Sequence, residues 1–145
     1  MVFFQNFYAN AFFIGFVGAM VLVTLMIFFR LFFKSTLQLS ESFGKYILGK
    51  KAKKEYAANF GTALHLLIHT LFGFFYGFLM PKLNISYGFL SGFFYGMIIW
   101  FLLNLVALPI IGKGMFGLKI GKKVPLVSLF YYFVFGLTIG WLFLF

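Results

Sequence analysis

Two histidines spaced four residues apart are the side chains of this sequence best suited to chemistry. His65 and His69 lie within the long apolar stretch Ala57 to Met80. Residues four apart on a helix share one face, so both imidazole rings are expected to point the same way. Histidine titrates near neutral pH and is a common metal ligand. Three roles follow: hydrogen bonds that hold helices together, movement of a proton, ion or small solute, or binding of a metal or haem.

The metal role lacks further ligands. A structural or catalytic metal site needs three or four nitrogen, sulfur or oxygen ligands, and His65 and His69 supply two. The only carboxylates, Glu41 and Glu55, lie in a lysine-rich segment outside the apolar runs. Two histidines on one helix face cannot bind opposite sides of one haem. We therefore expect no cofactor, with His65 and His69 the ligands of a metal if one is bound.

Enzyme chemistry is also poorly supported by the residue types. The chain has no aspartate and no cysteine. A serine nucleophile paired with His65 would have to be Ser128, and no acid is placed to orient the histidine. We therefore expect a protein that is not an enzyme.

The elements that must position these side chains are apolar helices. Hydrophobic residues make up 63% of the 145 residues and charged residues 10%, whereas a soluble domain is about 45–50% apolar. About 20 apolar residues in a helix cross a bilayer, and four runs reach that length, at about 11–33, 57–80, 88–111 and 125–145. Residues 1–10 carry no lysine or arginine, which favours a retained first span over a cleaved signal peptide. The sequence predicts one all-α membrane domain over residues 1–145, a bundle of four transmembrane helices.

Basic residues predict the orientation of this bundle. Seven lie at the end of the first run and in the following segment, four lie between the third and fourth runs, and one lies between the second and third. Lysine and arginine concentrate on the cytoplasmic side of membrane proteins. We therefore expect both chain ends outside and both basic segments in the cytoplasm of a prokaryotic cell, at its cytoplasmic membrane.

The first basic segment, residues 34–56, also has an apolar stripe. Leu39, Phe43, Tyr46 and Ile47 fall on one face of a helix, which favours a short amphipathic helix lying on an anionic leaflet; a solvated loop is the alternative. The net charge of +10 then reflects binding to anionic headgroups, not to nucleic acid. The lysines expected at the headgroups are Lys45, Lys50, Lys51, Lys53, Lys54, Lys113, Lys119, Lys122 and Lys123.

Aligning the four runs by depth predicts a polar layer in the inner half of the bundle. At a rise of about 1.5 Å per residue, His65 lies about 12 Å from the cytoplasmic end of its helix, and His69 lies one turn further along. Polar side chains of the other runs reach similar depths, and unpaired polar groups in hydrocarbon are costly. The other members of the predicted layer are Thr24, Trp100, Asn104, Ser128, Tyr131 and Tyr132.

The outer half carries a repeated segment, GFFYG, at residues 73–77 and 92–96. Depth alignment sets Gly73 beside Gly96 and Gly77 beside Gly92, and glycines four apart let helix backbones approach. We expect a close glycine contact between the second and third runs, extended by Gly88 and accompanied by a similar pair, Gly136 and Gly140, in the fourth. The alternative is a symmetric site of the inverted-repeat kind found in transporters.

Several of these features together resemble a known group of proteins. They are a first span with small residues, a second span with two histidines and GFFYG, the run Trp100 to Pro109 followed by glycine, and a final FGLTIGW. The order is similar to uncharacterised four-span prokaryotic membrane proteins of the YagU and YqhR kind. The resemblance implies the four-span fold and no activity. We expect a non-enzymatic subunit that associates with itself or with a larger membrane complex; the alternatives are a small transporter or channel, and a metal- or haem-binding membrane protein.

Overall fold

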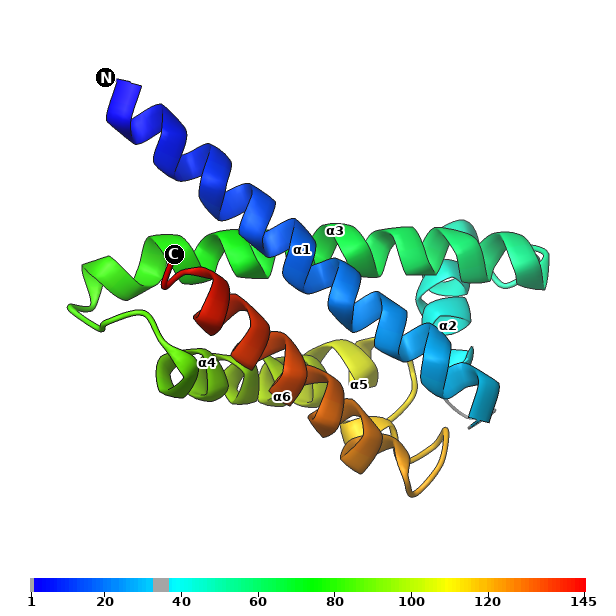
Figure 1. The fold of residues 1–145 in the computed structure, drawn as a ribbon. Helices are drawn as coiled ribbons and strands as arrows, with labels where there is room; N and C mark the ends of the chain where they lie inside the picture. The colour runs from blue at the N-terminus through cyan, green and yellow to red at the C-terminus, as the bar shows by residue number, and fades with distance from the viewer. Residues whose placement is uncertain (1, 33–36) are drawn as a thin grey trace.

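The computed structural model describes residues 2–32 and 37–145, and these residues form helices joined by short turns (Figure 1). No strand occurs among them. The long helices are α1 (Val2–Phe32), α3 (Lys54–Lys82), α4 (Phe89–Leu102) and α6 (Val124–Leu142). The short elements are α2 (Leu37–Leu48), a π-helical segment (Leu103–Ala107), α5 (Leu108–Ile110) and a 3₁₀ turn (Met115–Gly117).

Within residues 2–32 and 37–145, four helical segments are long and apolar enough to cross a membrane, which confirms that part of the prediction. They are Phe7–Phe29, Lys54–Lys82, Phe89–Ile110 and Val124–Leu142. The first helix begins at Val2, well before the predicted residue 11, because nothing in residues 2–10 breaks a helix. The third segment is continuous in its path but changes hydrogen-bonding pattern at Leu103.

This change at Leu103 precedes a proline. Pro109 has no N–H, so an α-helix would leave the carbonyl of Leu105 without its usual partner. The chain instead widens into a π-helix over Leu103–Ala107, where the N–H of Leu108 bonds to the carbonyl of Leu103. Such π segments are often found at functional sites, and this one places Asn104 in the interior of the bundle.

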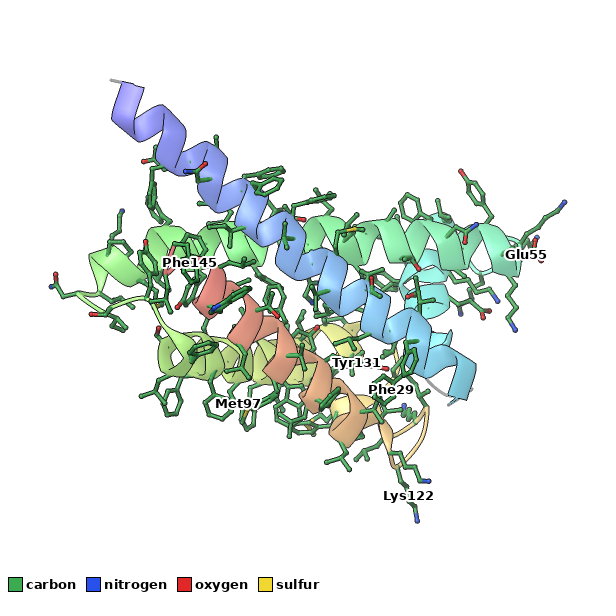
Figure 2. The ribbon with its side chains drawn as sticks, viewed as in Figure 1. Phe29, Glu55, Met97, Lys122, Tyr131 and Phe145 are labelled. Atoms are coloured by element: carbon green, nitrogen blue, oxygen red, sulfur yellow. The ribbon has the colours of Figure 1, made fainter. Side chains whose placement is uncertain are left out.

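The long helices run alternately in opposite directions, so the connections gather at two ends. Both chain ends and the α3–α4 turn lie at one end of the molecule, and α2 and the α5–α6 connection lie at the other (Figure 1). Glu55 and Lys122 mark the second end and Phe145 the first (Figure 2). The two segments predicted to be basic and cytoplasmic therefore lie at the same end of the bundle.

Among the four long helices, the most extensive contacts join α1 to α3 and α4 to α6. Gly15 of α1 lies against the backbone of α3 at Thr70 and Gly73, so that a Cβ on either glycine would overlap the other helix. In the other pair, Gly92 and Gly96 of α4 lie against the backbone of α6 at Gly136. Only glycine allows two helix backbones to come this close.

The expected glycine contact between the second and third runs is therefore wrong in its partners. Gly73 packs on α1 and Gly96 on α6, and Gly77 lies against Ala11 and Phe143 rather than Gly92. Depth alignment gives the level of each residue along the bundle. It does not give the rotation of each helix about its axis, and so it does not show which neighbouring helix a residue faces. The glycines do pack closely, as expected, but each GFFYG segment contacts a different outer helix.

α3 and α4 meet instead through tyrosine side chains. The Tyr95 hydroxyl donates to the carbonyl of Phe72 at 2.7 Å, and the Tyr76 hydroxyl lies 2.8 Å from that of Ser91. Tyr87 donates to the carbonyl of Gly77 at 2.7 Å. Burial, and secondarily the neighbouring Tyr76, raises the pKa of the Tyr87 phenol, which keeps its donor proton in place. These hydrogen bonds connect α3 and α4 through long side chains, without close contact of the two backbones.

The predicted helix in the first basic segment is present as α2, but it is not separate from the bundle. Gly44 lies against the backbone of Ala57, and Gly61 of α3 lies against that of Ser40. The side chain of Leu39 is buried with Leu108 and Val124. The other residues of the predicted stripe differ in burial: Phe43 is half-buried, whereas Tyr46 and Ile47 are exposed. α2 therefore covers, with half of its stripe, the end of the bundle opposite the chain ends, which is the inner end in the predicted orientation.

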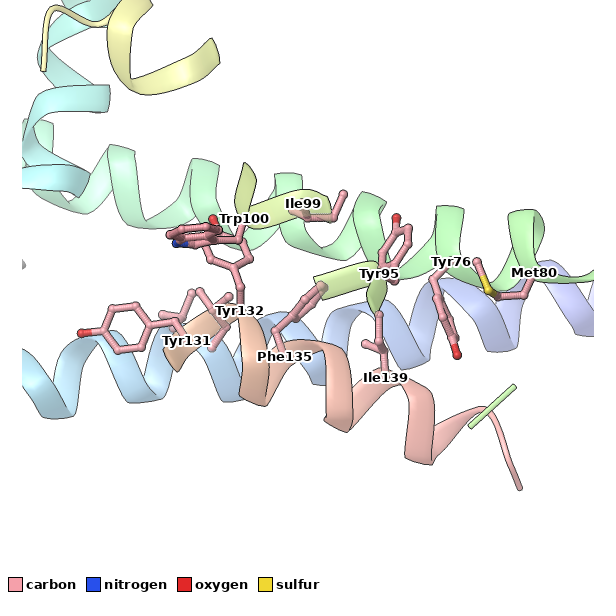
Figure 3. Packing of buried hydrophobic residues seen from close by; sticks show 11 residues of the cluster. Tyr76, Met80, Tyr95, Ile99, Trp100, Tyr131, Tyr132, Phe135 and Ile139 are labelled. Carbon is pink, nitrogen blue, oxygen red and sulfur yellow. The ribbon is translucent and has the colours of Figure 1, made fainter. Parts of the chain in front are cut away.

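The main hydrophobic core lies along the centre of the four long helices, where large side chains follow one another in a row (Figure 3). Tyr76 and Phe135 are wholly buried, and Trp100 and Tyr132 lie together at the inner end of the row. Phe116, in the turn between α5 and α6, packs on the indole of Trp100 with ring centroids 5.3 Å apart.

The glycine crossings can be tested by adding a side chain. Gly136→Leu would force side-chain atoms into the backbone of α4 at Gly92 and Gly96, and we expect the free energy of unfolding in detergent to fall by at least about 1–3 kcal/mol. Gly88→Leu is the matched control, because a Cβ there meets nothing within 4 Å, and its effect should stay within about 0.5 kcal/mol. Equal stability of the two variants would contradict the described packing.

Candidate functional site

The two histidines lie in the inner half of the bundle, on the side of α3 that faces α2 and α6. His69 is 1% exposed and bonds across the bundle: its Nε2 lies 2.9 Å from the Tyr132 hydroxyl. Its Nδ1 lies 2.7 Å from the carbonyl oxygen of His65. The His65 ring stacks on that of His69 at 5.6 Å and meets the edge of Phe43 at 5.1 Å.

These contacts decide the tautomer of His69. A carbonyl oxygen can only accept, so Nδ1 of His69 carries the proton that is donated to His65. In the neutral ring Nε2 is then an acceptor, and the Tyr132 hydroxyl donates to it. Both ring nitrogens of His69 are therefore hydrogen-bonded, Nδ1 within α3 and Nε2 across to α6. This arrangement fits the first of the three roles considered for the histidines.

A second set of hydrogen bonds joins the third segment to α6 at the same level. The Trp100 indole N–H donates to Ser128 Oγ at 3.0 Å, and Ser128 in turn donates to the carbonyl of Pro125. Asn104 Nδ2 donates to the carbonyl of Trp100 at 2.7 Å. The amide nitrogen of Asn104 therefore bonds within its own helical segment, and the amide oxygen takes no part in that bond.

A cavity of about 120 Å³ lies among these residues. α2 contributes Leu39 and Phe43, and α3, the π-helical segment, α5 and α6 supply the other walls. The apolar lining is Leu39, Phe43, Leu64, Ile68, Leu103, Ala107 and Leu108, and the polar lining is His65, His69, Asn104, Ser128 and Tyr132. The cavity is thus apolar over most of its wall, with polar groups gathered from three helical segments.

Two buried polar atoms of the lining make no hydrogen bond to any described residue. They are Nε2 of His65 and Oδ1 of Asn104. The assignment of the Asn104 oxygen is fixed, because its Nδ2 is the atom that donates to the Trp100 carbonyl. An unpaired buried polar atom costs about 1–3 kcal/mol. Each of these atoms has less than 1 Å² of accessible surface, so neither is open to the cavity that its residue lines.

The predicted polar layer is largely assembled, with exceptions. His65, His69, Asn104, Ser128 and Tyr132 line one cavity, and Trp100 bonds to one of them. Thr24 is exposed on α1 and belongs to no part of the layer. Tyr131 is buried but faces α1, where its ring meets Phe29 edge-on at 5.6 Å. Both residues lie at the predicted level along the bundle, but each is on a face of its helix that is turned away from the cavity.

Sequence reasoning missed the apolar walls of the cavity. The sequence pattern places Leu39 and Phe43 at a membrane surface, and it gives Leu103 and Ala107 no role beyond the third predicted span. Pro109 is one available signal, since a proline near a helix end disturbs the preceding turn. The close α2–α3 contact also had a signal in Gly44 and Gly61, which are small residues on facing helices.

The described residues contain no group of three or more histidine, cysteine, aspartate or glutamate side chains that could hold a metal ion. His69 has both nitrogens engaged in hydrogen bonds. His65 could offer a single nitrogen to a metal, which falls short of the three or four ligands of typical sites. The geometry therefore does not favour His65 and His69 as a metal pair.

The lysines predicted to meet headgroups come together at the inner end of the molecule. Lys45, Lys50 and Lys54 line one surface hollow with Lys113, which belongs to the other basic segment. Glu41 lies in the same hollow and pairs with Lys45 at 2.6 Å. The remaining predicted lysines, Lys51, Lys53, Lys119, Lys122 and Lys123, are exposed.

Comparisons of this chain with protein-family models, with curated proteins and with solved structures found no match. The resemblance to four-span proteins of the YagU and YqhR kind is thus untested and stays a prediction. What the site can do must be argued from its own residues.

The His69–Tyr132 bond can be tested by a double-mutant cycle. Tyr132→Phe leaves Nε2 of His69 without its donor, and we expect the free energy of unfolding in detergent to fall by about 0.6 kcal/mol, the average for such bonds in a membrane protein, and by no more than about 1.7 kcal/mol. His69→Leu combined with Tyr132→Phe should show coupling of the same size. Tyr46→Phe, on an exposed side chain, serves as control. Additive effects would contradict the bond.

Proposed function

We propose that the chain is a multi-pass integral protein of a prokaryotic cytoplasmic membrane. The observation that supports this most strongly is the outer surface of the long helices, where large apolar side chains are exposed on every one. Phe13 of α1, Phe75 of α3, Phe94 of α4 and Leu126 of α6 are all at least half exposed. Water would make such a surface aggregate, whereas hydrocarbon covers it at no cost.

The proposed orientation places both chain ends outside and both basic segments in the cytoplasm. The gathering of Lys45, Lys50, Lys54 and Lys113 in one hollow supports it, because the two segments then meet the same leaflet. Anionic headgroups attract lysines near the surface by about 1 kcal/mol each. The exposed residues Tyr46 and Ile47 of α2 lie at this end and suit the same interface.

The orientation can be tested with single cysteines, because the chain contains none of its own. In intact cells, Lys51→Cys and Lys122→Cys should react with an impermeant maleimide only after the membrane is opened. Leu144→Cys should react at once. Labelling of Lys51→Cys and Lys122→Cys from opposite sides, or a protected Leu144→Cys, would contradict the proposal.

Within the membrane we propose a non-enzymatic role, as a helical subunit that associates with a second copy or with a larger complex. The outward face of α4 supports this. Leu90, Phe94, Ile98 and Phe101 are exposed and recur at the spacing of one helix face. They form a continuous apolar stripe along a helix whose other side is held by α6.

A second candidate is a small carrier or channel for a proton, ion or small solute, favoured by the cavity beside His65 and Asn104. Its pathway would have to pass the polar lining at the inner half of the bundle. The close backbone contacts at Gly92 and Gly136 fill the outer half, so transport would require the helices to move.

Two measurements, crosslinking in native membranes and proton flux in proteoliposomes, separate the two candidates. The subunit role predicts crosslinked species larger than a monomer in native membranes, and no proton flux above that of empty vesicles when the purified protein is placed in proteoliposomes. The carrier role predicts flux in the parent that His65→Phe with His69→Phe abolishes. A monomer alone without flux would contradict both.

A further inference from the structure

The two basic segments meet in a surface hollow of about 450 Å³ at the inner end of the bundle. Pockets that hold small molecules commonly measure about 300–1,000 Å³. Four ammonium groups and one carboxylate line the hollow, which leaves it with three positive charges, so the occupant that fits is an anion. These charged groups belong to Lys45 of α2, Lys50 of the α2–α3 turn, Lys54 at the start of α3, Lys113 of the α5–α6 connection, and Glu41 of α2.

Glu41 brings two of these lysines together. Its Oε1 accepts from Nζ of Lys45 at 2.6 Å, and its Oε2 lies 3.9 Å from Nζ of Lys54. Both ammonium groups therefore lie at one carboxylate, whose single charge cannot balance the two of them. The Lys54 side chain is 72% exposed, so an anion that enters the hollow from outside can reach its ammonium group.

The other two lysines are placed by their turns. Lys50 follows Gly49, which has a φ of +94° and whose carbonyl closes a hydrogen-bonded turn. Lys113 follows Gly112, which has a φ of +77°, and its own N–H donates to the carbonyl of Leu108 at 2.9 Å. Glycine adopts such positive φ angles without strain. Neither lysine forms an ion pair with any residue that the structure describes, so the charge of each is available to an anion.

The remaining walls favour a lipid over a free anion. Tyr46, which is exposed, and Ile111 line the hollow beside the lysines. Ile111 comes directly after α5, where the third membrane-spanning segment ends. A phospholipid at this level has its phosphate at the lysines and its first apolar atoms beside Tyr46 and Ile111, whereas an inorganic phosphate has no apolar part for these side chains to contact.

We propose that this hollow binds the headgroup of an anionic phospholipid that carries two phosphate groups. Lys50 and Lys113 bind the phosphates together with the two lysines at Glu41, and Tyr46 and Ile111 contact the apolar part. Two phosphodiesters neutralise two of the three positive charges, whereas one leaves more of their mutual repulsion in place. The site rests on the membrane location proposed above, but not on the orientation or on association with a second subunit.

Native mass spectrometry of the protein purified in detergent measures lipid binding without a bilayer. The probes are cardiolipin with two phosphates, phosphatidylglycerol with one, and phosphatidylcholine with no net charge. We expect one cardiolipin per chain to bind at least about fivefold more tightly than phosphatidylglycerol, because its second phosphate meets further lysines. Phosphatidylcholine should bind more weakly than either. Inorganic pyrophosphate, a free anion with two phosphates, should not displace cardiolipin at equal concentration.

Two double variants of equal charge decide whether the hollow itself binds the lipid. Lys50→Gln with Lys113→Gln removes one charge from each basic segment, and should weaken cardiolipin binding by at least about tenfold. Lys122→Gln with Lys123→Gln is the matched control, because both side chains are exposed at the same end of the molecule but neither lines the hollow. The control should change the affinity by less than about twofold.

Thermal unfolding in detergent shows whether each variant is folded. Lys113 is half-buried, so if its substitution lowers the unfolding temperature, Lys50→Gln with Lys54→Gln takes its place, since both of these side chains are exposed. The same loss of at least about tenfold is expected from this pair.

Three results would overturn the proposal. Equal affinity for cardiolipin and phosphatidylglycerol would show that the second phosphate is not bound. Equal losses in the hollow variant and the control would show attraction to the whole basic surface. Displacement of cardiolipin by an equal concentration of pyrophosphate would make the hollow a site for a free anion. Cysteine labelling and crosslinking test the proposed orientation and subunit role without altering these affinities, so the two proposals fail separately.

Discussion

Backbone-to-backbone contact at two helix crossings determines the rest of this structure. Gly15 meets Gly73 where α1 crosses α3, and Gly92 meets Gly136 where α4 crosses α6. Helices of apolar residues gain little by exchanging lipid for each other, so close van der Waals packing must hold them together. The two crossings make two helix pairs that are built alike, and α1 crosses α3 near the middle of both helices (Figure 1).

Tilted helices separate on either side of the point where they touch. Here the space at the inner end is filled by large side chains, by α2 and by hydrogen bonds between distant segments. His69 and Tyr132 span the gap between α3 and α6, and Trp100 with Ser128 spans that between α4 and α6. What these groups and α2 do not fill is the cavity. The site is thus a consequence of how the helices cross.

The sequence was sufficient for properties that depend on composition and depth. Four long apolar runs, the level of His65 with Asn104 and Ser128, and the small-residue packing of the outer half all follow from counting residues along helices. The partners of the glycines did not follow, because Gly73 faces α1 rather than α4, and rotation about a helix axis depends on contacts with every neighbour. The prediction that Thr24 belongs to the polar layer is wrong for the same reason. α2 was predicted as a helix, but its packing on α3 did not follow, since Leu39 and Phe43 look the same whether they meet lipid or the end of a bundle.

The π-helical turn at Leu103–Ala107 has a consequence for how this chain should be aligned with others. A π turn amounts to an α-helix with one residue inserted, and everything after it is rotated relative to an uninterrupted helix. A homologue with a regular helix here would need a single-residue gap to match, and without that gap Leu108 and Pro109 would be paired with residues on the wrong face. Asn104 itself lies four residues after the buried Trp100 and would keep its face in a regular helix.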